Sequence, residues 1–158
     1  MPHPTSIRST VAAALRGGIA HVDFEQAVAG LDPQRVNDTL PGLPYSIYGL
    51  VEHLHRAQRD ILEFMTNPAY RERAWPADYW PTQPASPQDW LASVQGLRDD
   101  LAELGRLVER EDLDLNARVP NGKGQTNLRE FLLVLDHNAY HLGEIVTLRR
   151  ALGLWPGR

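Results

Sequence analysis

The segment 127–152 is the longest regular stretch of the sequence and constrains the fold most strongly. It contains no proline, and its apolar residues cover most of the circumference of a helix. These residues are Leu128, Phe131, Val134, Leu135, Leu142, Ile145 and Val146. A helix with so much apolar surface is expected to lie at the centre of a helical protein, and Gly153 and Pro156 mark its end.

Three further segments have helical character. Apolar residues recur at helical spacing over 47–65, a third helix is predicted for 87–111, and residues 6–31 are expected to form one helix that bends at Gly17 and Gly18. A residue suited to cap a helix precedes three of the four segments: Ser46, Ser86 and Thr126. With no alternating strand pattern, the sequence predicts an all-α fold, an antiparallel four-helix bundle.

The composition limits both the organisation and the function of the chain. A length of 158 residues suits one domain over 1–158, which can bury a core without disulfides or a structural metal. The chain has 20 acidic and 16 basic residues and no basic block, so nucleic acid is not an expected partner. The absence of cysteine excludes thiolate nucleophiles and leaves His, Asp and Glu as metal ligands.

Neither a leader nor a membrane segment is predicted. The apolar run 11–15 is too short for a signal peptide, and no window approaches the roughly 18 apolar residues of a spanning helix. A cytoplasmic protein without membrane contact is therefore expected. Between the second and third helices, the segment 67–87 is rich in proline and in aromatic residues, including Trp75 and Trp80. Such a composition indicates an irregular loop held in place by its rings, which could form one wall of a site.

The histidines are the one chemically suggestive feature. There are six, of which His3 and His21 are expected at the surface. His137 and His141 lie four residues apart, so both imidazoles can reach one ion from the same face of a helix. The motif lacks the Glu of the HExxH metalloproteases, which excludes that class. Without a third ligand, this face could equally be an ordinary solvated one.

The predicted second helix offers two candidates for the third ligand. His53 and His55 flank its apolar stripe on opposite sides, so periodicity does not choose between them. Three imidazoles on one ion would leave positions open for water or substrate, as in catalytic sites. Two carboxylates on the same face of the last helix, Glu130 and Glu144, are candidates for orienting a ligand or transferring a proton, and Glu52, Tyr48 and Tyr140 are weaker ones.

Three sequence stretches together resemble a known family. They are LPYSIYGLVEHLHRAQRDIL, the YWP at 79–81, and GQTNLREFLLVLDHNAYHLGEIVTLRRALGLWP, and they resemble the DinB-like superfamily, which includes YfiT-type metal-dependent hydrolases and bacterial thiol transferases. The resemblance implies a four-helix bundle, often homodimeric, with a divalent metal, usually zinc or nickel. By the same resemblance the ligands are His53, His137 and His141, and His55 is then expected to face solvent.

The resemblance implies a metal-dependent enzyme of thiol-transferase or hydrolase type. The bound ion would activate a water or a low-molecular-weight thiol, with Glu144 as the candidate catalytic residue. Because the chain has no cysteine, the sulfur would arrive with the substrate. The alternative is a non-catalytic metal-binding or interaction protein, associated with stress or DNA damage.

Overall fold

A computed structural model of the chain describes residues 6–156, so His3 lies outside the described residues. Within that range the chain forms five helices and no strand, which confirms the all-α prediction. The helices are α1 (Ile7–Arg16), α2 (Phe24–Val28), α3 (Ile47–Thr66), α4 (Pro87–Glu109) and α5 (Asn127–Ala151). No helix of the described part is long and apolar enough to cross a lipid bilayer.

The N-terminal region differs from the single bent helix predicted for 6–31. Gly17 and Gly18 have φ values of 81° and 78°, a conformation that ends α1, and Asp23 starts α2 by accepting a hydrogen bond from the Gln26 amide. A Cβ on Gly17 would lie 2.7 Å from the Asp23 Cβ. The prediction of one helix was therefore wrong, because the glycine pair breaks the helix and allows the chain to turn back.

The three long helices begin where the sequence predicted. The side chains of Ser46, Ser86 and Thr126 accept hydrogen bonds from the backbone amides of Gly49, Asp89 and Arg129, respectively. Each bond satisfies one of the amides that the first turn of a helix leaves without an intrahelical partner. The predicted helix ends agree with the structure within two residues.

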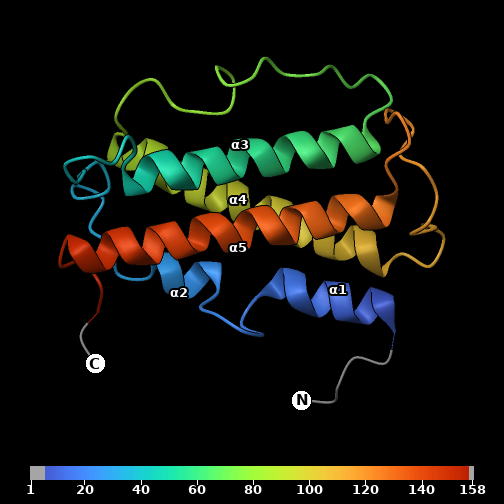
Figure 1. Cartoon of the computed structure of the whole chain (residues 1–158), viewed down its shortest axis with the longest axis horizontal. Helices are drawn as coiled ribbons and strands as arrows, with labels where there is room; N and C mark the ends of the chain where they lie inside the picture. The colour runs from blue at the N-terminus through green and yellow to red at the C-terminus, as the bar shows by residue number, and fades with distance from the viewer. Residues whose placement is uncertain (1–5, 157–158) are drawn as a thin grey trace.

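The helices pack lengthwise around two apolar clusters. In Figure 1, α3, α4 and α5 run side by side, and α1 and α2 follow one another along the side of α5 that is opposite α3. The packed pairs are α3 with α4 and α5, α1 with α4 and α5, and α2 with α5. Ile145 of α5 lies in one cluster and Phe131 in the other, so this helix contributes to both halves of the core.

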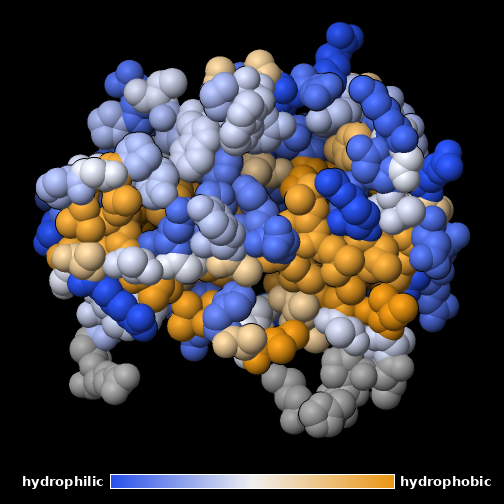
Figure 2. All heavy atoms as spheres, viewed as in Figure 1, coloured by the Kyte–Doolittle hydropathy of each residue, from blue (hydrophilic) through white to orange (hydrophobic). Residues whose placement is uncertain are grey.

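One face of α5 remains at the surface. Leu132 and Tyr140 of α5 are 51% and 65% exposed, and Ile7 of α1 is 64% exposed. Figure 2 shows apolar patches between charged side chains on the side of the molecule that carries α1, α2 and α5. The central position expected for this helix is thus only partly realised, because no helix within residues 6–156 covers its outer face.

Candidate metal centre

Three histidines from two helices meet inside the protein. His53 comes from α3, and His137 and His141 come from α5. One ring nitrogen from each lies within 4.8 Å of the others, and the Nε2 atoms of His53 and His137 are 3.1 Å apart. His53 and His141 are 3% and 8% exposed. These three side chains could hold one metal ion, with each imidazole contributing one nitrogen.

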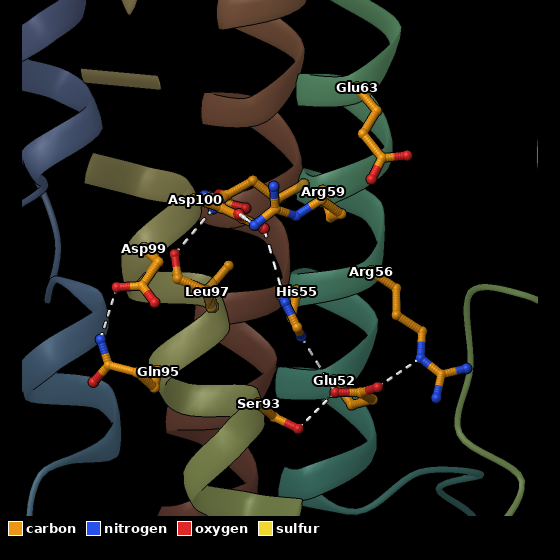
Figure 3. A network of polar contacts seen from close by, with 12 residues as sticks. Glu52, His55, Arg56, Arg59, Glu63, Ser93, Gln95, Leu97, Asp99 and Asp100 are labelled. Carbon is orange, nitrogen blue, oxygen red and sulfur yellow. Dashed lines mark hydrogen bonds and ion pairs between the residues drawn. The ribbon is translucent and has the colours of Figure 1, made fainter. Parts of the chain in front are cut away.

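His55 does not join this group and does not face solvent. Figure 3 shows it between Glu52 and Asp100, on the side of α3 that faces α4. Its Nδ1 is 3.5 Å from Glu52 Oε2, its Nε2 is 3.8 Å from Asp100 Oδ2, and its side chain is 26% exposed. The expectation of a solvent-facing His55 was wrong, because α4 packs over this flank of α3 with Gly96 leaving room for the ring.

A carboxylate orients His141. The Nδ1 of His141 lies 2.7 Å from Glu144 Oε2, and the hydroxyl of Tyr45 donates to Glu144 Oε1 at 2.6 Å. The hydrogen bond to Glu144 is the largest of the effects that raise the pKa of Tyr45 to about 12, so this hydroxyl stays protonated at neutral pH. With the proton of His141 on Nδ1, its Nε2 keeps a free lone pair, as in metal sites where a carboxylate supports the ligand histidine.

The 67–87 loop supports His53 in a different way. The carbonyl oxygen of Tyr79 lies 3.1 Å from His53 Nδ1, and the Trp80 ring stacks on the imidazole with centroids 3.9 Å apart and planes at 3°. Arg56 holds the same loop by donating to the Trp80 carbonyl at 3.1 Å. The loop therefore forms one wall of the histidine group, as its aromatic composition predicted.

Burial keeps the histidines ready to bind a cation. Burial, reinforced by the nearby His141 and His53, lowers the pKa of His137 to about 4. Burial also lowers the pKa of His53, and the Tyr79 carbonyl only partly opposes it. Both rings are therefore neutral at pH 7, which is the form of histidine that binds metals.

The other candidate residues are distributed differently. Glu130 is buried two turns before His137 and pairs with the neighbouring Arg129 at 2.9 Å. Tyr48 lies in the apolar core, and the exposed ring of Tyr140 lies 4.9 Å from the ring of His141. Of the two carboxylates proposed on this face of α5, the structure thus brings only Glu144 to the histidines.

Glu52 lies on the α4 side of α3, in the network around His55 (Figure 3). Its carboxylate accepts hydrogen bonds from Ser93 at 2.5 Å and from Arg56 at 2.6 Å. Burial alone would raise the pKa of Glu52, but hydrogen bonds from His55, Ser93 and Arg56 outweigh it and lower the pKa to about 2. Glu52 therefore stays ionised and ties α3 to α4.

Sequence reasoning named Glu144 as a candidate for orienting a ligand but missed Tyr45 and Tyr79, the other residues that support the ligands. Tyr45 and Glu144 are 99 positions apart, and Tyr79 acts through a backbone carbonyl that the identity of its side chain does not reveal. Two signals pointed to this part of the loop: its aromatic composition, and the YWP at 79–81 that belongs to the family resemblance.

The fold and this site together define a class of protein. The helical fold, with three histidines facing one another from two helices, is that of a DinB/YfiT-like metal-dependent protein. More specifically, a model of the mycothiol S-transferase family matches residues 11–153, nearly the whole chain, and the chain therefore belongs to this family. A comparison with individually curated proteins gives no match.

Proposed function

We propose that the protein is a metal-dependent S-transferase that joins a low-molecular-weight thiol of the mycothiol type to an electrophilic substrate. The observation that carries the proposal is the group His53, His137 and His141 in a member of the mycothiol S-transferase family. The donor set fits a divalent ion of borderline softness such as zinc or nickel. The 3.1 Å between the Nε2 atoms of His53 and His137 supports this fit, because two nitrogens this close can both reach one ion.

The chemistry follows from an uncharged ligand set with open positions. A divalent ion held by three imidazoles would lower the pKa of a thiol placed beside it. In the transfer, the thiol gives up its proton to solvent water, its sulfur forms a bond to an electrophilic carbon, and the leaving group departs from that carbon with its bonding electrons. The chain contributes no thiol of its own, since it has no cysteine.

We assign Glu144 a positioning role in place of the catalytic role first considered for it. One of its oxygens lies 2.7 Å from His141 Nδ1, and the other accepts the Tyr45 hydroxyl at 2.6 Å. Both oxygens are therefore engaged in holding the ligand histidine, which supports a positioning role for this carboxylate.

A neighbouring cavity supports the proposal that the thiol substrate is uncharged. It has a volume of about 500 Å³ and adjoins the histidine group through Trp80 and Tyr45, whose rings stack with centroids 5.8 Å apart. All of its lining residues are uncharged, and Thr39, Thr82 and Gln83 add hydrogen-bonding groups. We propose that this cavity holds the body of the thiol and that it favours neutral polar thiols over glutathione, whose charges would lose hydration there without a partner.

The test combines metal analysis with product detection. Purified protein is loaded with zinc or nickel and incubated with mycothiol or glutathione and a panel of alkylating electrophiles, and thioethers are measured by mass spectrometry. We expect one ion per chain, thioether formation with mycothiol, and loss of both in His141→Ala. His21→Ala is the control, since His21 is exposed and outside the site.

Two outcomes would change the assignment. Turnover by the metal-loaded protein no higher than that of His141→Ala across the whole panel would refute the transferase. Cleavage of a substrate by water, without any thiol, would identify a hydrolase that uses the same metal centre.

We further infer that the chain forms one domain, a four-helix bundle in which α1 and α2 together take the fourth position, and that it is a homodimer. The bundle is not the fully antiparallel one that the sequence predicted, because the packed helices α3 and α4 run in the same direction in Figure 1 and the 67–87 loop leads back along the molecule between them. The apolar patches on the side of the molecule that carries α1, α2 and α5 support the dimer, because contiguous exposed apolar patches mark interaction sites. Light scattering coupled to size exclusion measures the mass in solution, and a monomer at all accessible concentrations would contradict this inference.

A further inference from the structure

A buried carboxylate outside the metal centre holds the loop that supports it. Asp60 of α3 is 8% exposed and lies two turns after His53, about 10 Å along the helix. Its Oδ2 accepts the hydroxyl of Tyr79 at 2.6 Å, its Oδ1 accepts the hydroxyl of Tyr70 at 3.1 Å, and Arg73 Nε lies 3.5 Å from Oδ1. All three partners belong to the 67–87 loop, so one carboxylate anchors this loop on α3.

The anchored residue is also the one that contacts a histidine of the metal centre. Tyr79 donates its hydroxyl to Asp60 and accepts, through its carbonyl oxygen, from His53 Nδ1 at 3.1 Å. The adjacent Trp80 stacks on the same imidazole. Hydrogen bonds to an ionised acceptor are stronger than those between neutral groups, so the contact with Asp60 is a firm constraint on where this carbonyl lies.

We propose that Asp60 is a positioning residue of the metal centre, which acts through Tyr79 to keep the proton of His53 on Nδ1 and its Nε2 directed at His137 and His141. The inference rests on the metal binding of the proposed function, and it assigns a role to a carboxylate that touches no histidine of the group. It follows that metal affinity depends on a carboxylate that lies two helical turns from the ligand His53.

The structure supplies a matched pair of hydroxyls for the test. Tyr70 and Tyr79 donate to the two oxygens of the same carboxylate, but only Tyr79 also contacts His53. The Tyr70 ring packs instead against Phe64, with centroids 5.3 Å apart. A loss of loop anchoring in general should affect both variants, whereas a loss of ligand positioning should affect only one.

The experiment compares Tyr79→Phe, Tyr70→Phe and Asp60→Asn with the wild type. Metal dissociation constants are measured by competition with a chromophoric chelator, and the protonated ring nitrogen of His53 is identified by nitrogen-15 NMR of the metal-free protein. We expect Tyr79→Phe and Asp60→Asn to bind the ion about 10-fold more weakly and to populate the other tautomer of His53. Tyr70→Phe should stay within about 2-fold of the wild type, although both phenylalanine variants lower the melting temperature similarly.

The outcomes separate this inference from the proposed function. Equal metal affinity in the two phenylalanine variants, with an unchanged His53 tautomer in Tyr79→Phe, would overturn the positioning role. A wild-type protein that binds no metal would refute the proposed function, while the tautomer of the metal-free protein would still decide the role of Asp60. Metal binding without any transferase activity would leave this inference standing.

Discussion

Replacing Glu144 by glutamine tests how His141 is held. The carboxylate lies 2.7 Å from His141 Nδ1 and accepts the Tyr45 hydroxyl at 2.6 Å, one donor at each oxygen. Glutamine keeps the shape of the side chain but replaces one acceptor by an amide group that only donates. In Glu144→Gln, His141 and Tyr45 therefore compete for a single, uncharged acceptor.

The expected effect is large enough to measure. A hydrogen bond to a charged group contributes about 1.5–3 kcal/mol. Loss of such support for a ligand histidine weakens metal binding about 10–100-fold, which corresponds to about 1.4–2.8 kcal/mol. Tyr45→Phe removes only the contact on the far side of the carboxylate and should weaken metal binding by about 3-fold or less.

The assay measures the metal dissociation constant by chelator competition and kcat at saturating metal. If Glu144 positions His141, Glu144→Gln binds the ion more weakly, and kcat recovers to within about 3-fold of the wild type once the site is filled. Unchanged metal affinity together with a fall in kcat of about 100-fold at full occupancy would refute this reasoning and identify Glu144 as a general base.

Two further predictions concern the packing of α3 against α4. A Cβ at Gly96 would lie 2.3 Å from His55 Nε2, so Gly96→Ala should displace the ring and lower the free energy of unfolding by about 1–3 kcal/mol in urea titrations. In the control Gly105→Ala, on the same helix, the new Cβ meets nothing within 4 Å, and the free energy of unfolding should rise by about 0.5–1 kcal/mol. Equal effects of the two substitutions would contradict the packing argument. The pKa of Glu52 is lowered from 4.5 to about 2, so its ionised form stabilises the fold above pH 4.5 and this contribution disappears as the pH falls towards 2. Glu52→Gln should therefore lose about 2 kcal/mol less stability than the wild type between pH 7 and pH 3, and parallel pH profiles would refute the linkage.

The long helices could be predicted because their signals are local. Caps, proline positions and apolar spacing identify α3, α4 and α5 within two residues at each end. The N-terminal region could not be predicted in the same way. A Gly17-Gly18 pair is compatible with either a bend or a break, and the break depends on Asp23, which lies against Gly17 only after the chain has turned.

The histidine group was predictable in part for the same reason. His137 and His141 share a face of α5 by spacing alone, but His53 and His55 flank the apolar stripe of α3 symmetrically. Which of them meets the other two depends on which neighbour packs on each flank. In the structure α5 lies beside His53 and α4 beside His55, and this tertiary arrangement has no local signature in the sequence.

The charge of the ligand set bears on what the centre can activate. Three neutral imidazoles would leave the full charge of a divalent ion in place, and Glu144 contacts His141 at the ring nitrogen Nδ1. Such an ion would stabilise an anionic sulfur more strongly than one bound by carboxylates. Because the chain has no cysteine, no thiolate of its own competes for the open positions. A centre of this kind would therefore favour a substrate that ionises as it binds, and a thiol ionises more readily than a simple alcohol because its pKa is lower.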